Sequence, residues 1–167
     1  VEAFHTLRGL LMATMMSDLI ETNKKDIPQQ ILENIDLGLK TSNQEIISAE
    51  KLRWSLNHKI NEFFKNHDFL VCPATSVSPF SSEKSFVTKI NGVECKTYID
   101  WFAITFVLTL TSCPILSLPC GFTKNGLPVS LQVVGKPRSE DSLLSFGKLL
   151  EDAFNFKRLL PINPKIK

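Results

Sequence analysis

The sequence predicts a mixed α/β protein in which helices come first and a few strands with a closing helix follow. Three observations support this class. Apolar residues recur at helical spacing in the first 67 residues, short apolar runs bounded by proline or glycine come next, and an acidic segment at 139–141 opens a last helix. With 167 residues, 43% of them hydrophobic and 22% charged, the chain has the composition of one globular domain.

Three helices are predicted in the first part of the chain. The first covers residues 2–20, and its apolar face comprises Phe4, Leu7, Leu11, Met15 and Leu19. Pro28 suits the first turn of a second helix, which should end near Gly38. Ser42 and Glu45 have the three-residue spacing of a capping box and predict the start of a third helix.

Three short strands are predicted after residue 67. They are the apolar runs "DFLVCP" at 68–73, "ILSL" between Pro114 and Pro119, and "VSLQVVG" at 129–135. We expect the two prolines to mark the ends of the second strand. Because two of these strands are almost continuously apolar, they are typical of a larger sheet that is covered on both faces.

Turn residues separate these elements. The serine-rich segment 73–96 is long for a loop, which predicts a functional or mobile segment with a tight turn at Asn91-Gly92. Asn125-Gly126 predicts a second turn before the last strand. The closing helix should begin with the acidic residues after Ser139 and run through Phe154.

The stretch from Trp101 to Phe122 contains no charged residue and could be a membrane span, a buried core or one wall of an active site. A spanning helix needs about twenty apolar residues. Pro114 and Pro119 would each remove a helical hydrogen bond, which lipid cannot replace. The buried core is therefore favoured, as a helix over 98–110 followed by a strand.

Composition excludes several classes of function. The net charge of +2 gives no footprint for nucleic acid or an anionic membrane. The four cysteines and three histidines have no zinc-site spacing, so no metal or cofactor is expected, and free thiols indicate a cytoplasmic protein. The sequence contains no GxSxG and no glycine-rich phosphate loop. Cys113 is the remaining candidate nucleophile, but its neighbours are apolar and a buried structural thiol is favoured.

Four segments resemble the carboxy-terminal third of the amidase signature family in order and spacing. They are "DFLVCPAT", "YIDWFAITFVLTLTSCPILSLPCGF", "GLPVSLQVVGKPRSEDSLL" and "LLEDAF". The matching positions are Asp68, Pro73, Thr105, Leu110, Pro114, Pro119, Gly121, Gly126, Leu127, Pro128, Leu131, Gln132, Gly135, Asp141 and Leu144. The chain departs from the family at Ser112 and Ser130, where glycine is usual, and at Thr109, where many members have asparagine.

The resemblance implies that residues 1–167 are the carboxy-terminal part of one amidase domain, helical over 1–67, with strands and the closing helix over 68–160. It implies a hydrolase of amide C–N bonds that uses a serine, a second serine in a cis peptide and a lysine. These residues belong to the first half of the family's chain, and this sequence has no Gly-Gly that could match the family's catalytic loop. No catalytic residue is therefore carried over, and the chain alone is expected to be inactive.

The expected contribution of this chain is sheet scaffold and part of a pocket for a small amide. We expect the pocket to be lined by Trp101, Thr105, Phe106 and Leu108. An uncovered strand edge should favour self-association. Two alternatives remain open at this point: a stand-alone scaffold or association module without enzymatic activity, and a thiol enzyme that uses Cys113. Hydrolysis and ammonia transfer are both compatible with the resemblance.

Overall fold

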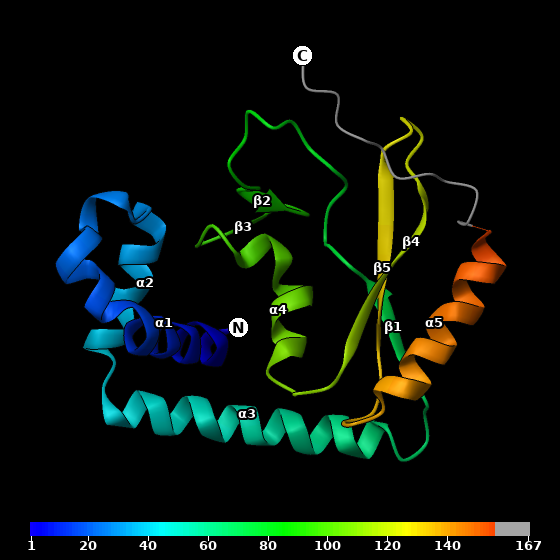
Figure 1. Cartoon of the computed structure of the whole chain (residues 1–167), viewed down its shortest axis with the longest axis horizontal. Helices are drawn as coiled ribbons and strands as arrows, with labels where there is room; N and C mark the ends of the chain where they lie inside the picture. Colours follow the sequence, from blue (N-terminus) through cyan, green and yellow to red (C-terminus); the bar gives the residue numbers. More distant parts are fainter. Residues whose placement is uncertain (156–167) are drawn as a thin grey trace. The chain divides into compact units, whose positions relative to one another are not determined.

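The computed structural model describes residues 1–155, which fall into two compact units (Figure 1). The first comprises residues 1–62 and 109–111, and the second comprises 63–108 and the residues from 112 on. Helices and antiparallel strands are both present, so the predicted α/β class is confirmed.

The predicted division of the chain at residue 67, between a helical part and a part with strands and the closing helix, stays a prediction. Residues 156–160, which the prediction included with the closing helix, lie outside the described residues.

The first unit is helical. It contains α1 (Glu2–Asn23), a short 3-10 helix η1 (Lys24–Asp26), α2 (Gln29–Lys40) and all but the last residue of α3 (Asn43–Phe63). The three predicted helices are therefore confirmed. The second one begins after Pro28 as expected but continues two residues beyond Gly38.

Small residues let α1 and α2 approach each other closely. Gly9 and Gly38 meet where the helices cross, and a Cβ on Gly38 would collide with the backbone carbonyl of Gly9. Beside this contact, the Arg8 guanidinium donates a hydrogen bond to Asn34 Oδ1 at 2.8 Å. Asn34 is buried, so the pair satisfies a polar side chain that would otherwise lose its water.

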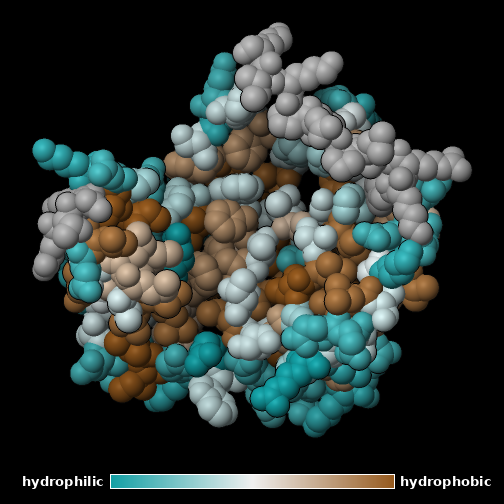
Figure 2. All heavy atoms as spheres, in the orientation of Figure 1, coloured by the Kyte–Doolittle hydropathy of each residue, from teal (hydrophilic) through white to brown (hydrophobic). Residues whose placement is uncertain are grey.

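The apolar face predicted for α1 is not its buried face. Leu11, Met15 and Leu19 are 53%, 69% and 44% exposed, whereas Ala3 and Ala13 are each 6% exposed. The side of α1 that carries Gly9 packs on α2, because only small residues permit the close crossing. The larger apolar residues consequently face outward, and brown surface over α1 and α2 is visible in Figure 2.

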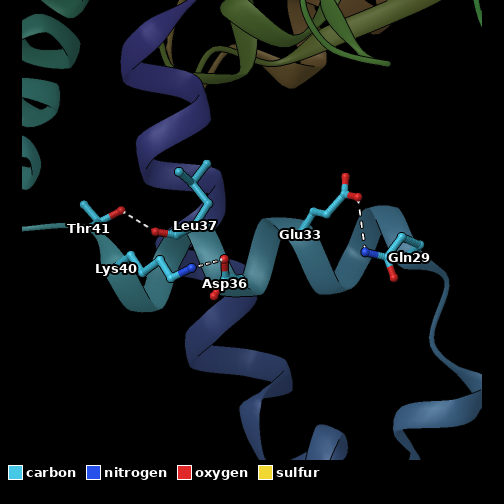
Figure 3. A network of polar contacts seen from close by, with 6 residues as sticks. All are labelled: Gln29, Glu33, Asp36, Leu37, Lys40 and Thr41. Atoms are coloured by element: carbon cyan, nitrogen blue, oxygen red, sulfur yellow. Dashed lines mark hydrogen bonds and ion pairs between the residues drawn. The ribbon is translucent and has the colours of Figure 1, made fainter.

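On the exposed side of α2, polar side chains that lie one helical turn apart contact each other (Figure 3). Gln29 donates to Glu33 at 3.2 Å, and Lys40 donates to Asp36 at 2.7 Å. Pairs of this kind stabilise a helix by a few tenths of a kcal/mol each, about 0.2–0.5. They support α2 locally and indicate an ordinary solvated face.

The capping box at the start of α3 is confirmed. Glu45 Oε2 accepts hydrogen bonds from the Ser42 backbone N–H at 2.8 Å and from the Ser42 hydroxyl at 2.6 Å. The Glu45 N–H in turn donates to Ser42 Oγ at 3.3 Å. These hydrogen bonds from Ser42 hold the pKa of Glu45 below its ordinary value.

The second unit contains a three-stranded antiparallel sheet in the order β1 (Leu70–Pro73), β5 (Pro128–Val134), β4 (Ile115–Phe122). All three predicted strands are confirmed. α5 (Glu140–Phe154) covers one face of the sheet, with Leu143 packed against Leu118 and Val133. Gly147 of α5 leaves room for the side chain of Leu116. This cluster is the core of the unit.

Two hairpin turns of the second unit follow the sequence prediction. Asn91 and Gly92 have φ values of 47° and 83° and join β2 (Lys89–Ile90) to β3 (Val93–Glu94). Gly126 has φ of 75° and joins β4 to β5. Positive φ is the conformation that glycine and asparagine adopt most readily, which explains these residue choices.

The expectation that Pro119 ends a strand is wrong. β4 continues to Phe122, with an irregularity in its pairing to β5 between Pro119 and Gly121. In the described sheet β4 pairs with β5 alone and lies at an edge, where a residue without an N–H is tolerated. Pro119 is therefore compatible with a strand at this position.

The uncharged stretch begins as a 3-10 turn and a short helix. η2 (Asp100–Phe102) leads into α4 (Ala103–Thr109), close to the helix predicted over 98–110. Among the described residues, no helix has the length and apolarity that crossing a membrane requires. Between α4 and β4, Ser112 has φ of 55°, a conformation that glycine adopts more easily, so the family's preference for glycine there has a physical reason.

Candidate functional site

A cavity of about 880 Å³ lies within the second unit, beside the end of β1. Its size is in the range of small-molecule pockets, roughly 300–1,000 Å³. Three parts of the chain surround it: the segment that follows β1, Trp101 of η2, and residues of β4 and β5. The lining residues are 71–80, Trp101, Ser117, Cys120 and 128–131.

The cavity combines apolar surface with neutral polar groups. Hydroxyl groups come from Thr75, Ser76, Ser78, Ser117 and Ser130. The described lining residues include no carboxylate, ammonium, guanidinium or imidazole group. The site therefore suits an uncharged ligand with an apolar part and a few hydrogen-bonding atoms.

The segment 74–80 forms one wall of the cavity. Thr75 Oγ1 donates to the Val77 carbonyl at 2.9 Å, which supports a local turn. At its far end the ring of Phe80 meets the ring of Trp101 edge to face, with centroids 5.5 Å apart and planes at 84°. The Trp101 indole N–H is used in a bond to the Tyr98 carbonyl at 3.0 Å. The Phe80–Trp101 pair therefore borders this side of the cavity.

Three hydrogen bonds fix the start of the same wall. The Ala74 N–H donates to the Ser130 carbonyl at 3.0 Å, which extends the pairing of β1 with β5 by one residue. The Thr105 hydroxyl donates to the Ala74 carbonyl at 2.6 Å. The Gln132 amide donates to the Pro73 carbonyl at 3.1 Å. The wall is therefore anchored to the sheet and to α4.

Gln132 is a residue that sequence reasoning did not place near the site. It lies on the central strand and is 2% exposed, and the same Nε2 also donates to the Ile104 carbonyl at 3.1 Å. One signal could have pointed to it. A glutamine inside the apolar run "VSLQVVG" is expected to have a buried side-chain amide, and a buried amide needs hydrogen-bond partners nearby.

The four predicted pocket residues are not brought together. Trp101 lines the cavity, and Thr105 contacts its wall through Ala74. Leu108 instead lines a second cavity of about 440 Å³, together with residues of β1 and α4. Phe106 is 3% exposed and packs edge to face on Phe102. A role in substrate binding stays a prediction for all four.

The described residues offer little catalytic chemistry of their own. Within 1–155, no group of three or more histidine, cysteine or acidic side chains could hold a metal ion. Cys113 is buried at 9% exposure, as expected for a structural cysteine. The arrangement can bind and orient a neutral group, and it supplies backbone and hydroxyl hydrogen bonds.

Comparisons with known proteins concern the family and the fold of the chain. The family model described as Amidase matches residues 2–144. A glutamyl-tRNA(Gln) amidotransferase subunit from Trichormus variabilis is 33% identical over 107 residues, which is 64% of this chain and 21% of that protein. The corresponding protein from Thermodesulfovibrio yellowstonii is 30% identical over 114 residues, 68% of this chain and 22% of that protein. The chain thus spans about a fifth of the length of these curated relatives.

Solved structures share the fold over nearly the whole chain. A bacterial aryl acylamidase of the amidase signature enzymes superposes with a TM-score of 0.78 at 21% identity, covering 96% of this chain and 36% of that one. A structure described as an amidase gives a TM-score of 0.80 at 21% identity, with 91% and 35% coverage. The 6-aminohexanoate cyclic dimer hydrolase gives 0.75 at 17% identity, with 92% and 34% coverage.

Proposed function

The chain belongs to the amidase family, and we propose that it is a carboxy-terminal portion of an amide hydrolase that acts on C–N bonds. The observation that carries this proposal is the unequal coverage of the shared fold: 96% of this chain corresponds to 36% of the aryl acylamidase. The remaining elements of such a fold come from outside this sequence. We assign the serine, cis-serine and lysine of the catalytic triad to that remaining part.

In this proposal the chain supplies sheet scaffold and part of the substrate pocket. The 880 Å³ cavity supports the second role, because it has the size and the neutral lining that a small amide requires. Trp101 and Phe80 would contact an apolar part of the substrate. Thr105 would act through Ala74, and Phe106 and Leu108 would support α4 from positions outside this cavity.

Ammonia transfer is a second candidate activity for the whole protein. It is favoured by the names of the curated relatives, which are glutamyl-tRNA(Gln) amidotransferase subunits. Hydrolysis and transfer share the cleavage of an amide C–N bond, in which water takes the acyl group, and they differ in the fate of the released ammonia. Ammonia that appears free in solution indicates hydrolysis, whereas its incorporation into an added acceptor indicates transfer.

A stand-alone association module without enzymatic activity is the alternative from another class. Exposed apolar residues support association in either case, and they include Leu11, Met15, Leu19, Leu37 and Leu39 of the first unit. β4 also lies at an edge of the described sheet. We propose that the isolated chain self-associates. Cys72, Cys95 and Cys120 are free thiols, which supports a reducing compartment such as the cytoplasm.

The size of the native protein tests this proposal. An antibody raised against this chain should isolate from cell extract a species much larger than 18.8 kDa, in which mass spectrometry identifies these residues together with a serine- and glycine-rich segment and a lysine. A native species of 18.8 kDa that binds no second amidase segment would contradict the hydrolase proposal and favour the association module.

A further inference from the structure

The side-chain amide of Gln132 connects two segments that are far apart in the sequence. Its Nε2 donates to the Pro73 carbonyl and to the Ile104 carbonyl, each at 3.1 Å. Pro73 ends β1 and begins the wall formed by residues 74–80, whereas Ile104 lies in α4 just after Trp101. One amide group on the central strand therefore holds the backbone at Pro73, where the wall of residues 74–80 starts, and at Ile104, near Trp101.

The position of Gln132 on the sheet explains why its amide can reach both carbonyls. It pairs with Cys72 of β1 on one side and with Ser117 of β4 on the other. At 2% exposure, the amide has no water to replace a lost partner. Removing the amide would take a donor from two carbonyl groups: that of Pro73, which lines the cavity, and that of Ile104, three residues after the lining residue Trp101.

We propose that Gln132 is a positioning residue: it holds the wall of residues 74–80 at a fixed distance from Trp101 and so determines which neutral amides fit between them. Gln132 itself does not line the cavity, and its influence passes through Pro73 and Ile104. The substrate selected in this way has a flat or slender apolar group that packs against the Phe80–Trp101 pair. This inference rests on the proposed function as far as substrate is concerned.

Trp101 fluorescence tests the positioning role in the chain itself. Trp54 is 74% exposed and is replaced first, as Trp54→Phe, so that Trp101 is the remaining indole. Gln132→Met removes the amide at similar size. It should shift the native-state emission of Trp101 to longer wavelength, because Phe80 moves away and water reaches the indole. It should also speed hydrogen exchange at the Ala74 N–H by about tenfold or more, as the loss of one supported hydrogen bond implies.

Leu118→Ala is the matched control, because Leu118 belongs to the core cluster that packs under α5. It should lower the unfolding midpoint without moving the native emission. Thr105→Val is the second variant, because it cuts the bond from the Thr105 hydroxyl to the Ala74 carbonyl in the same wall and should also shift the emission to longer wavelength. Gln132→Leu, which also lacks the amide, replaces Gln132→Met if that variant fails to fold. Folded variants with unchanged Trp101 emission would overturn the positioning role.

Selectivity tests the substrate half of the inference in the full-length protein. Gln132→Met should change the ratio of kcat/KM for acetanilide to kcat/KM for a longer-chain acyl anilide, mostly through KM. A merely structural role would reduce both values by the same factor, and that result would overturn the selectivity claim. Wild-type protein with no activity on either amide would contradict the proposed function, and the emission result would then decide the role of Gln132.

Discussion

The hydroxyl of Thr105 donates a hydrogen bond to the carbonyl of Ala74 at 2.6 Å and joins two segments 31 residues apart. Sequence reasoning expected Thr105 to line the substrate pocket. The bond gives Thr105 a role in stability as well, because a carbonyl beside the cavity depends on this hydroxyl. Thr105 therefore supports the backbone beside the cavity, in addition to its predicted role in binding.

Thr105→Val should lower the free energy of unfolding by about 1 kcal/mol, the usual net value of one hydrogen bond. Thr105→Ser keeps the hydroxyl and should retain most of that stability. Urea denaturation followed by far-UV circular dichroism gives both values. Equal destabilisation by the two variants would show that the methyl group matters, and the hydrogen bond would then lose its assigned role.

Leu118→Ala should be much more damaging. Leu118 is 5% exposed and packs with Val133 and Leu143, so its truncation leaves a cavity that costs about 2–5 kcal/mol. Leu149→Ala is the control, because Leu149 is 65% exposed on α5 and its loss should cost within about 0.5 kcal/mol. The same denaturation experiment compares them. Similar midpoints for both variants would place the core of this unit elsewhere.

Patterns within a few residues predicted most helices, strands and turns correctly. The errors arose where contacts between distant elements determine the structure. The Ser42–Glu45 box and the Asn91-Gly92 turn depend on neighbours within a few residues, and both were predicted. The buried face of α1 depends on Gly38 of another helix, so its apolar spacing alone gave the wrong face. Pro119 was misjudged because its tolerance depends on a strand's place in the sheet.

The same distinction applies to the candidate site. Trp101 was predicted as a pocket residue and lines the cavity, whereas Phe106 of the same uncharged stretch is buried against Phe102. Gln132 was not predicted as a site residue, since its partners Pro73 and Ile104 lie 59 and 28 residues away. The register of β5 with β1 places Gln132 opposite Cys72, next to Pro73, and the packing of α4 brings Ile104 within reach of the same amide.

The capping box predicts a pH dependence of stability. Hydrogen bonds from Ser42 hold the pKa of Glu45 below its ordinary value in the folded chain. The stabilisation is therefore complete above the ordinary pKa of the unfolded chain, and it is lost as the pH falls through the lower folded value. Thermal midpoints of wild type and Glu45→Gln should differ at neutral pH and converge in acid. A constant difference at all pH values would contradict this assignment.

Self-association of the isolated chain follows from its exposed apolar surface. Leu11 and Met15 are 53% and 69% exposed on α1, and surface of this kind seeks a partner. Light scattering should show species above the monomer, with ANS binding higher than for an intact globular control. Leu11→Glu combined with Met15→Glu should reduce both signals. A monomeric wild type that binds no ANS would instead indicate a self-sufficient module.

The release of aniline from acetanilide by the purified chain decides whether these residues are one part of an amidase. We expect the rate of buffer alone, because the nucleophilic serine, the cis-serine and the lysine are assigned to the remainder of the enzyme. The antibody-purified native protein should hydrolyse the same amide or, as an amidotransferase, release ammonia from a primary amide and pass it to an added acceptor. Turnover that scales with the concentration of the isolated chain and survives repurification would contradict this assignment. Its loss in Cys113→Ser would then identify a thiol enzyme.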